Sequence, residues 1–254
     1  MEILTNPVPS STTDRPHISF VVPCYNEAEN IAETVAEVES AMRDASIARF
    51  EIIVVDDCSK DQSAAVVTAL IRDKSHLKLI RNTNNLGFGG AYKEGVRIAT
   101  GTYVIMVPGD NAHPKGSILP IIAKAGEADI IIPYVTNPAT RSRRRQALSR
   151  CFTGILNLLF GMRIPYFNGT VLHKTDLLRS IDINTNGFAY QAEALVKLIK
   201  HGASFAAVGV QIDESRKKRT TAFKPKNVYR VVNTIFTLWR DVRHTPSTHT
   251  ASQA

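Results

Sequence analysis

Apolar runs and amphipathic segments alternate through the first half of the chain. Runs rich in β-branched residues predict buried strands at 17–26, 50–59, 77–82 and 102–108. Helical periodicity separates them at 27–44, 61–73 and 89–100, and the first of these helices carries Ile31, Val35 and Val38 along one face. Strands that are apolar on both sides and alternate with helices predict an α/β fold, in which helices cover both faces of a mostly parallel sheet.

The second half is less regular but continues in the same style. Its pattern predicts strands at 128–135 and 204–213, and helices at 115–126, 141–162, 188–202 and 224–243, with 170–181 leading into the third of these helices. We expect one domain over 17–243, with a nucleotide-binding half at about 17–114 and an acceptor half at about 115–243. Polar segments at 1–16 and 244–254 predict a disordered leader and a disordered tail.

The charge balance indicates partners that carry phosphate. The chain has 31 Lys and Arg against 23 Asp and Glu, a formal net charge of +8, and two basic runs lie at 141–145 and 216–219. Nucleotides, anionic lipids and nucleic acids all suit such a surplus, while solvated loops are the ordinary explanation of a charge run. The runs lack the interleaved aromatic residues of single-strand binders, so we expect no nucleic-acid partner.

The sequence predicts a cytoplasmic protein with neither a signal peptide nor a transmembrane helix. Three scattered cysteines fit a reducing compartment, the first residues contain no apolar core of a signal peptide, and no apolar run approaches the ~20 residues of a membrane span. The segment 141–162 has a basic start and an apolar body, which fits a helix lying on the cytoplasmic face of a membrane. A helix that packs on the core fits the same pattern.

Polar clusters follow the predicted strands of the first half, at 23–27, 56–59, 84–91 and 108–111. The carboxyl ends of parallel strands meet at one edge of the sheet, where ligands bind in open α/β folds. Asp56 and Asp57 are costly at the end of a buried strand unless they are hydrogen-bonded, so they can accept from a base or a ribose hydroxyl. Asp57 can alternatively cap the following helix.

Three segments together carry a family resemblance: VVPCYNEAENI, FEIIVVDDCSKDQS and NNLGFGGAYKEGVRIATGTYVIMV. They resemble family-2 glycosyltransferases of the GT-A fold, in the branch around dolichyl-phosphate mannosyltransferase and bacterial polyprenyl-phosphate glycosyltransferases. The resemblance covers roughly 17–230, and 186–205 and 214–223 also match that branch. It implies inverting transfer of a sugar from a nucleoside-diphosphate sugar, most directly to a polyprenyl or dolichyl phosphate. A hydroxyl acceptor, or a catalytically weak nucleotide-sugar-binding homologue, is the alternative.

The resemblance also implies site residues. Those expected to bind the donor are Pro23, Tyr25, Glu27, Asp56, Asp57, Gly87, Gly89, Gly90, Asn111 and Gln191. Those expected to act in catalysis are Asp110, Glu193 and Arg216. Glu193 is the candidate base for a hydroxyl acceptor, although an ordinary glutamate on a helix surface fits its position nearly as well.

The expected metal-binding motif departs from the family pattern. Relatives carry Asp-x-Asp here, whereas this chain has Pro108 at the first position and Asp110 at the second. We expect Asp110 and the donor diphosphate to hold Mg²⁺ or Mn²⁺, with Asn111 or His113 as further ligands, or else Asp110 hydrogen-bonds within a metal-free loop. Arginine pairs well with phosphate, so the basic runs can supply the missing positive charge. Their members are Arg141, Arg143, Arg144, Arg145, Arg216, Lys217, Lys218 and Arg219.

Overall fold

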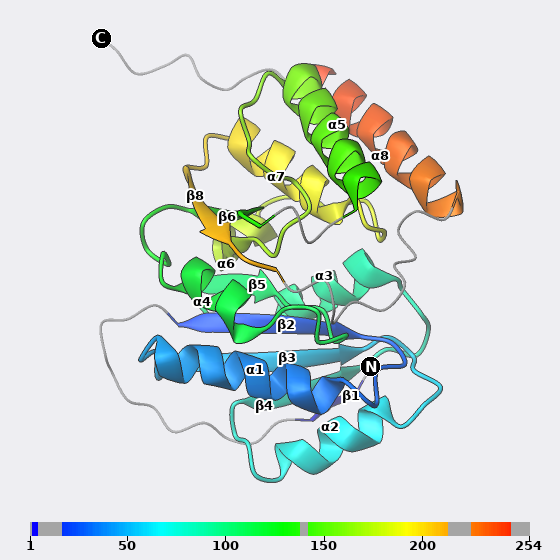
Figure 1. Cartoon of the computed structure of the whole chain (residues 1–254). Coiled ribbons are helices and arrows are strands. Elements are labelled where there is room, and N and C mark those ends of the chain that lie inside the picture. Colours follow the sequence, from blue (N-terminus) through cyan, green and yellow to red (C-terminus); the bar gives the residue numbers. More distant parts are fainter. Residues whose placement is uncertain (1, 5–16, 138–141, 213–224, 245–254) are drawn as a thin grey trace.

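Eight strands form a single sheet within the residues that the computed structural model describes, namely 2–4, 17–137, 142–212 and 225–244 (Figure 1). The order is β1-β4-β3-β2-β5-β7-β6-β8. The strands are β1 (Glu2–Leu4), β2 (Ile18–Cys24), β3 (Phe50–Asp56), β4 (Leu77–Arg81), β5 (Tyr103–Met106), β6 (Ile130–Val135), β7 (Leu172–Lys174) and β8 (Phe205–Val210). Strands β2 to β5 pair in parallel, as do β6 and β8, whereas β7 runs antiparallel between β5 and β6. The prediction of a mostly parallel α/β sheet is confirmed.

Helices cover both faces of the sheet. One core lies under α1 (Ile31–Asp44), α2 (Ser63–Ile71) and α4 (Lys115–Ile122), and the other under α3 (Phe88–Ile98), α6 (Thr175–Arg179) and α7 (Tyr190–Lys200). Helices α5 (Arg143–Phe160) and α8 (Pro225–His244) lie side by side beyond α7 (Figure 1). The helices predicted at 141–162 and 224–243 are therefore present, within a few residues of the expected bounds.

The apolar runs reflect burial on both sides of each central strand. In β3, Ile52 and Val54 enter the first core while Ile53 and Val55 enter the second, and all four are fully buried. Each such side chain contributes about 1.5–3 kcal/mol on burial. This is why the strands read as continuous apolar stretches rather than as alternating ones.

Two strands differ from the sequence-based expectation. The predicted disordered leader is wrong for residues 2–4, which form β1 and pair antiparallel with β4, whose backbone groups would otherwise be open at the edge of the sheet. Strand β7 was not expected as a separate element. Residues 5–16 and 245–254, which were also predicted to be disordered, lie outside the described residues.

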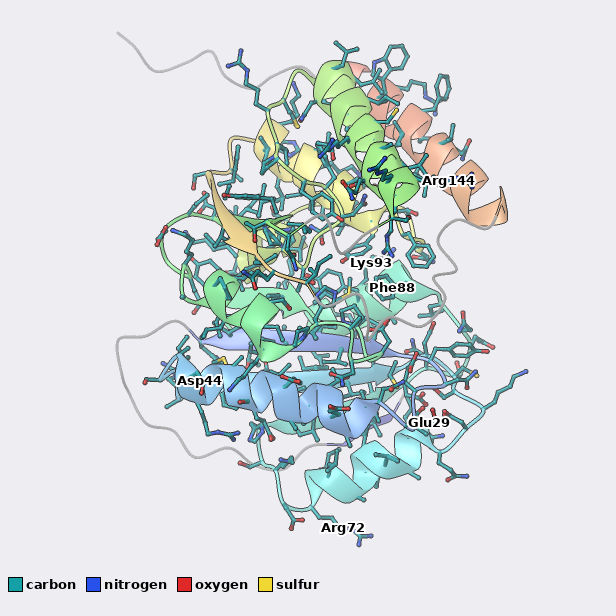
Figure 2. The ribbon with its side chains drawn as sticks, in the orientation of Figure 1. Glu29, Asp44, Arg72, Phe88, Lys93 and Arg144 are labelled. Carbon is teal, nitrogen blue, oxygen red and sulfur yellow. The ribbon has the colours of Figure 1, made fainter. Side chains whose placement is uncertain are left out.

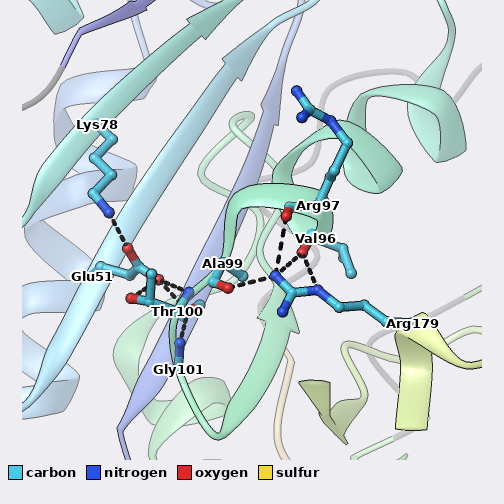
Figure 3. Close-up of polar contacts among 9 residues, drawn as sticks. Glu51, Lys78, Val96, Arg97, Ala99, Thr100, Gly101 and Arg179 are labelled. Carbon is cyan, nitrogen blue, oxygen red and sulfur yellow. Dashed lines mark hydrogen bonds and ion pairs between the residues drawn. The ribbon is translucent and has the colours of Figure 1, made fainter. Parts of the chain in front are cut away.

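A polar network ties the sheet together at the edge opposite the polar strand ends (Figure 3). The buried carboxylate of Glu51 accepts hydrogen bonds from Lys78 at 2.6 Å, from the Thr100 hydroxyl at 2.9 Å and from Ser19. Burial acts to raise the pKa of Glu51, but hydrogen bonds from Lys78 and Ser19 bring it below its ordinary value. The Arg179 guanidinium donates to carbonyl groups at the end of α3. These contacts fix the ends of the sheet and leave the polar strand ends on the other side available for a ligand.

Candidate active site

The ends of β2, β3 and β5 meet at one edge of the sheet, as the sequence predicted. Cys24 pairs with Asp56 in the register of β2 and β3, and the Asp57 N–H donates to the Cys24 carbonyl at 2.8 Å. The Gly109 N–H donates to the Pro23 carbonyl at 3.1 Å, which brings the loop after β5 against the end of β2. Burial raises the pKa of the Cys24 thiol to about 12, so this cysteine stays protonated and is not a nucleophile at neutral pH.

Asp57 organises a neighbouring loop. Its carboxylate accepts hydrogen bonds from the backbone N–H groups of Leu86 and Gly87, both at 2.8 Å, and from the Asn82 amide at 2.9 Å. The alternative that Asp57 caps the following helix is wrong, since α2 has Gln62 at its N-cap and no side-chain capping bond. Asp57 therefore holds the loop between Asn82 and Gly87 in place.

Asp56 keeps more of its capacity for hydrogen bonds. One carboxylate oxygen accepts from the Ser59 N–H at 3.2 Å, and the other lies 3.8 Å from Nε of Arg81. Tyr25 lies on the adjoining loop with 44% of its surface exposed, and the Glu27 N–H donates to the Ser63 hydroxyl at 2.8 Å. This edge thus presents a buried carboxylate beside an exposed aromatic ring.

Backbone strain gathers at the same edge. Three of the four non-glycine residues with positive φ in the described chain lie in the loops after β2, β3 and β5: Asn26 at 56°, Cys58 at 64° and Asn111 at 54°. Such conformations cost of order 1–3 kcal/mol each and are common at binding sites. Each of the three loops therefore contains one residue in the left-handed conformation that non-glycine residues rarely adopt.

The loop after β5 is closely tied to α1. The Thr34 hydroxyl donates to the Gly109 carbonyl and accepts from the Asn111 N–H, both at 3.1 Å. Asp110 accepts from the Ala112 N–H at 3.1 Å, so part of its carboxylate serves the loop itself. The side-chain oxygen of Asn111 is buried and has no hydrogen-bond partner. A carboxylate and an unpaired amide oxygen are therefore neighbours at the position of the family's metal motif.

The glycines at the start of α3 serve chain packing. The N–H groups of Gly89 and Gly90 donate to the Asn186 carbonyl at 2.9 and 3.4 Å, and that of Gly87 donates to Asp57. A Cβ atom on Gly89 would lie 2.9 Å from Tyr190 Cβ. The segment before α7 thus lies against the N-terminus of α3. That these glycines lie near the donor remains a prediction.

Helix α7 carries Gln191 and Glu193, both 3% exposed. The Glu193 carboxylate accepts from the N–H groups of Asn184 and Thr185 at 2.9 and 3.0 Å, and pairs with Lys197 at 2.7 Å. A carboxylate held in this way fixes the segment before α7 and is poorly suited to act as a general base. The alternative of an ordinary glutamate on a helix surface is wrong, because the side chain is buried, and the catalytic role of Glu193 stays a prediction.

A large apolar cavity opens from this edge toward the outer helices. Its volume is about 870 Å³. Pro108, His113, Thr170 and Gln191 line its inner end, while its walls come mainly from apolar residues of α5 and α8. The predicted amphipathic helix at 141–162 thus forms one wall. Core packing applies to the face of α5 that carries the buried Leu156 and Phe160, while the position of this helix on a membrane stays a prediction.

The sequence of the site region matches a family model described as glycosyl transferase family 2, over residues 19–182, which is more than half of the chain. The chain belongs to this family.

Curated family members give two informative comparisons. A dolichyl-phosphate beta-glucosyltransferase from Dictyostelium discoideum is 34% identical over 39% of this chain, and the match spans only 32% of that protein's length. An undecaprenyl-phosphate 4-deoxy-4-formamido-L-arabinose transferase from Klebsiella pneumoniae is 24% identical over 90% of this chain and 68% of its own length.

Solved structures support the fold. A mannosyltransferase from Pyrobaculum calidifontis, in complex with GDP-Man and Mn²⁺, superposes with a TM-score of 0.65 at 19% identity, covering 92% of this chain and 66% of the other. Together with the sheet topology, this similarity confirms the GT-A fold expected for a family-2 glycosyltransferase.

The predicted site residues fall into two groups and a remainder. Pro23, Tyr25, Glu27, Asp56, Asp57, Asp110 and Asn111 lie at the ends of β2, β3 and β5, and Gly87, Gly89 and Gly90 join them to the segment before α7. Gln191 lines the cavity near Pro108. The basic residues Arg141, Arg216, Lys217, Lys218 and Arg219 lie outside the described residues, while Arg145 lines the cavity.

Sequence reasoning missed a polar pair and a buried histidine near the cavity. The Thr170 hydroxyl lies 3.3 Å from Nδ1 of His113, and the Gln191 amide lies 3.2 Å from Nε2 of His173. A histidine inside the apolar strand TVLHK was the one available signal for the second contact.

Proposed function

We propose that the chain is an inverting glycosyltransferase that moves a sugar from a nucleoside-diphosphate sugar to a polyprenyl or dolichyl phosphate. The observation that carries this proposal is the apolar cavity between α5 and α8, which begins beside Pro108 and His113. The names of the curated relatives support the same acceptor class.

The shape and chemistry of the cavity suit an acceptor with a charged head and a hydrocarbon tail. Ile155, Leu159, Ile235 and Phe236 provide apolar walls for the tail. Arg145 lies in the same lining, and a guanidinium pairs well with phosphate oxygens. Burial of each CH₂ group of the tail would contribute about 0.8 kcal/mol.

The reaction follows from this arrangement. An acceptor phosphate oxygen attacks C1 of the sugar, a new C1–O bond forms, and the bond from C1 to the donor diphosphate breaks with its electron pair on the leaving group. A phosphate acceptor is already anionic and needs no general base, which agrees with the engagement of Glu193 by the backbone and Lys197. The protein's part is to position the two substrates and to balance charge on the diphosphate.

The residues after β5 fit a divalent metal when a donor is bound. No group of three His, Cys, Asp or Glu side chains that could hold a metal ion occurs among the described residues. Asp110 and the unpaired amide oxygen of Asn111 are hard oxygen donors, and Mg²⁺ commonly combines one or two carboxylates with phosphates and water. Mg²⁺ or Mn²⁺ held there would neutralise charge on the departing diphosphate.

We propose that the chain lies peripherally on the cytoplasmic face of a membrane, and exposed apolar side chains on α5 and α8 support contact with lipid. No helix in the described part of the chain is long and apolar enough to cross a bilayer. Leu148, which follows the basic start of α5, is 56% exposed, and Leu158 at the other end of α5 and Phe236 on α8 are 84% and 60% exposed. Apolar side chains next to arginines suit an anionic membrane surface.

The decisive test pairs binding with transfer. Thermal shift with UDP, GDP, CDP, dTDP and their common sugar conjugates, with and without Mg²⁺ and Mn²⁺, should give one donor that stabilises the protein. That donor should then transfer its sugar to a polyprenyl phosphate in detergent and not to the matching polyprenol. Transfer to the polyprenol would favour a hydroxyl acceptor, and binding without any transfer would favour the catalytically weak homologue.

Arg216 offers a separate prediction about charge at the diphosphate. We expect Arg216→Ala to raise the donor KM or lower turnover by about tenfold or more, because loss of a charged hydrogen bond costs roughly 1.5–3 kcal/mol. Steady-state kinetics checks this, with Arg72→Ala as the control on the exposed end of α2. Equal, small effects of both changes would exclude a role for Arg216.

A further inference from the structure

A histidine occupies the centre of the sheet. His173 lies in the middle of β7, opposite Val104 of β5 and Ile130 of β6, and is fully buried. A polar ring in such a position is costly unless its hydrogen bonds are satisfied. Burial lowers the pKa of the ring to about 3, so the imidazole is neutral at neutral pH.

The ring holds one side chain of the cavity. Nε2 of His173 lies 3.2 Å from the amide nitrogen of Gln191, while no described residue bonds to its Nδ1. A neutral imidazole has one N–H and one lone pair, so the Gln191 amide donates to Nε2 and the ring proton lies on Nδ1. This contact uses one N–H of the Gln191 amide and fixes the orientation of the group, and the amide oxygen is an acceptor for the cavity that this residue lines.

Gln191 belongs to the polar inner end of an otherwise apolar cavity. His113 and Thr170 line the same end and contact each other at 3.3 Å. Pro108, at the first position of the family's metal motif, also lines it, so a transferred sugar would lie within reach of this end. An amide oxygen accepts hydrogen bonds, which suits a hydroxyl group and opposes a phosphate.

We propose that Gln191 is a specificity-determining residue that accepts a hydrogen bond from one hydroxyl of the transferred sugar, and that His173 is the positioning residue that fixes its amide. This inference rests on the proposed function and assigns a sugar-reading role within the same site. A site built to bond a hydroxyl strongly rejects donors that lack it in the right place.

The test compares epimeric donors on variants of the buried pair. His173→Met removes the hydrogen bond at similar volume, whereas His173→Gln restores an acceptor at the place of Nε2. The ratio of kcat/KM is measured for UDP-glucose against UDP-galactose, and for GDP-mannose against GDP-glucose, with a polyprenyl phosphate acceptor. We expect His173→Met to lower the ratio of kcat/KM between the preferred donor and its epimer by at least about tenfold. We expect His173→Gln to leave that ratio unchanged.

Two further variants separate this role from a structural one. Ile130→Val alters the neighbouring position of β6 without changing a polar group, and should keep the ratio. Gln191→Met removes the amide that would bond the sugar hydroxyl and leaves the sheet unaltered. It should lower the ratio of kcat/KM between epimeric donors, and it tests the proposal even if His173→Met fails to fold. Equal losses of activity with every donor, at unchanged ratios, would overturn the inference. A wild-type protein that transfers no sugar from any conjugate in the UDP, GDP, CDP and dTDP panel would instead overturn the proposed function.

Discussion

Asp56 and Asp57 are adjacent in sequence and differ in their contacts. The sequence indicated that both carboxylates are costly to bury at the end of a strand. In the structure each carboxylate is stabilised by a different set of contacts. Asp57 uses its carboxylate for the loop that ends at Gly87, while Asp56 has longer contacts, with the Ser59 N–H at 3.2 Å and Arg81 at 3.8 Å. Local sequence could not distinguish the two, because the partners of Asp57 lie about 30 residues further along the chain.

His173 gives a pH-dependent prediction at the same scale. Its pKa is about 3 in the folded protein against 6.5 in an ordinary environment. Between these values the unfolded chain binds a proton that the folded protein does not, so the free energy of unfolding falls as the pH decreases from 6.5 toward 3. From about pH 7 to about pH 5, wild type should lose about 2 kcal/mol more than His173→Gln.

Urea unfolding at the two pH values measures this difference. The comparison cancels the titration of all other groups, because the two proteins differ only at residue 173. Equal losses in wild type and variant would mean that the ring is protonated in the folded state or reaches solvent.

Helix α3 was predicted correctly as an element, whereas the packing of its glycines was not foreseen. The pattern NNLGFGGAYKEG correctly predicted a helix after a glycine-rich turn. The donor-binding role of the glycines stays a prediction, and the structure shows them in contact with another segment of the chain. A close approach by another chain segment requires the same absence of Cβ atoms, and only the tertiary fold reveals that this segment is 184–190.

The close contact at α3 makes a testable prediction about stability. Gly89→Ala would place a Cβ atom 2.9 Å from both the Gly187 carbonyl oxygen and Tyr190 Cβ, so we expect a loss of about 1–3 kcal/mol from overpacking. Gly116→Ala in α4 is the matched control, because a Cβ there meets nothing within 4 Å. The control should be neutral or stabilising by up to about 1 kcal/mol, since alanine is the better helix former.

Chemical denaturation gives both values. Equal stability of the two variants would show that the segment before α7 moves aside at low cost, and that α3 is not held by it.

At the scale of the whole molecule, the alternation of apolar runs and helices was enough to predict the sheet, both helical layers and the edge where the polar strand ends meet. Strand β7 escaped prediction because it has three residues, one of them a buried histidine. The cavity could not be predicted at all, since its lining comes from segments as far apart in the sequence as Phe88 and Trp239. The match to a family model fixed the class of enzyme, while the acceptor stays a proposal.

The distribution of charge predicts how the molecule would lie on a membrane. Figure 2 shows Arg144 on α5 at one end of the molecule and Arg72 beyond α2 at the other. We expect Arg144→Glu to reduce the fraction of protein that sediments with vesicles of anionic lipid. The binding free energy should weaken by about 1 kcal/mol or more, because each basic residue near the surface contributes about that much. Arg72→Glu makes the same change in net charge away from the membrane and should have little effect.

Binding to neutral vesicles provides the contrast. If both variants lose binding equally, attraction depends on net charge alone and α5 does not face the lipid.

The exposed leucine and phenylalanine side chains of α5 and α8 have a practical consequence for the purified protein. An exposed apolar surface rimmed by polar residues tends to associate with another apolar surface in water. Without lipid, a second molecule of the same protein supplies that surface. Its hydrodynamic radius should therefore grow with concentration and return to that of a monomer in mild detergent. Preparations kept dilute or supplied with detergent would preserve the open cavity, whereas concentrated ones would hide it.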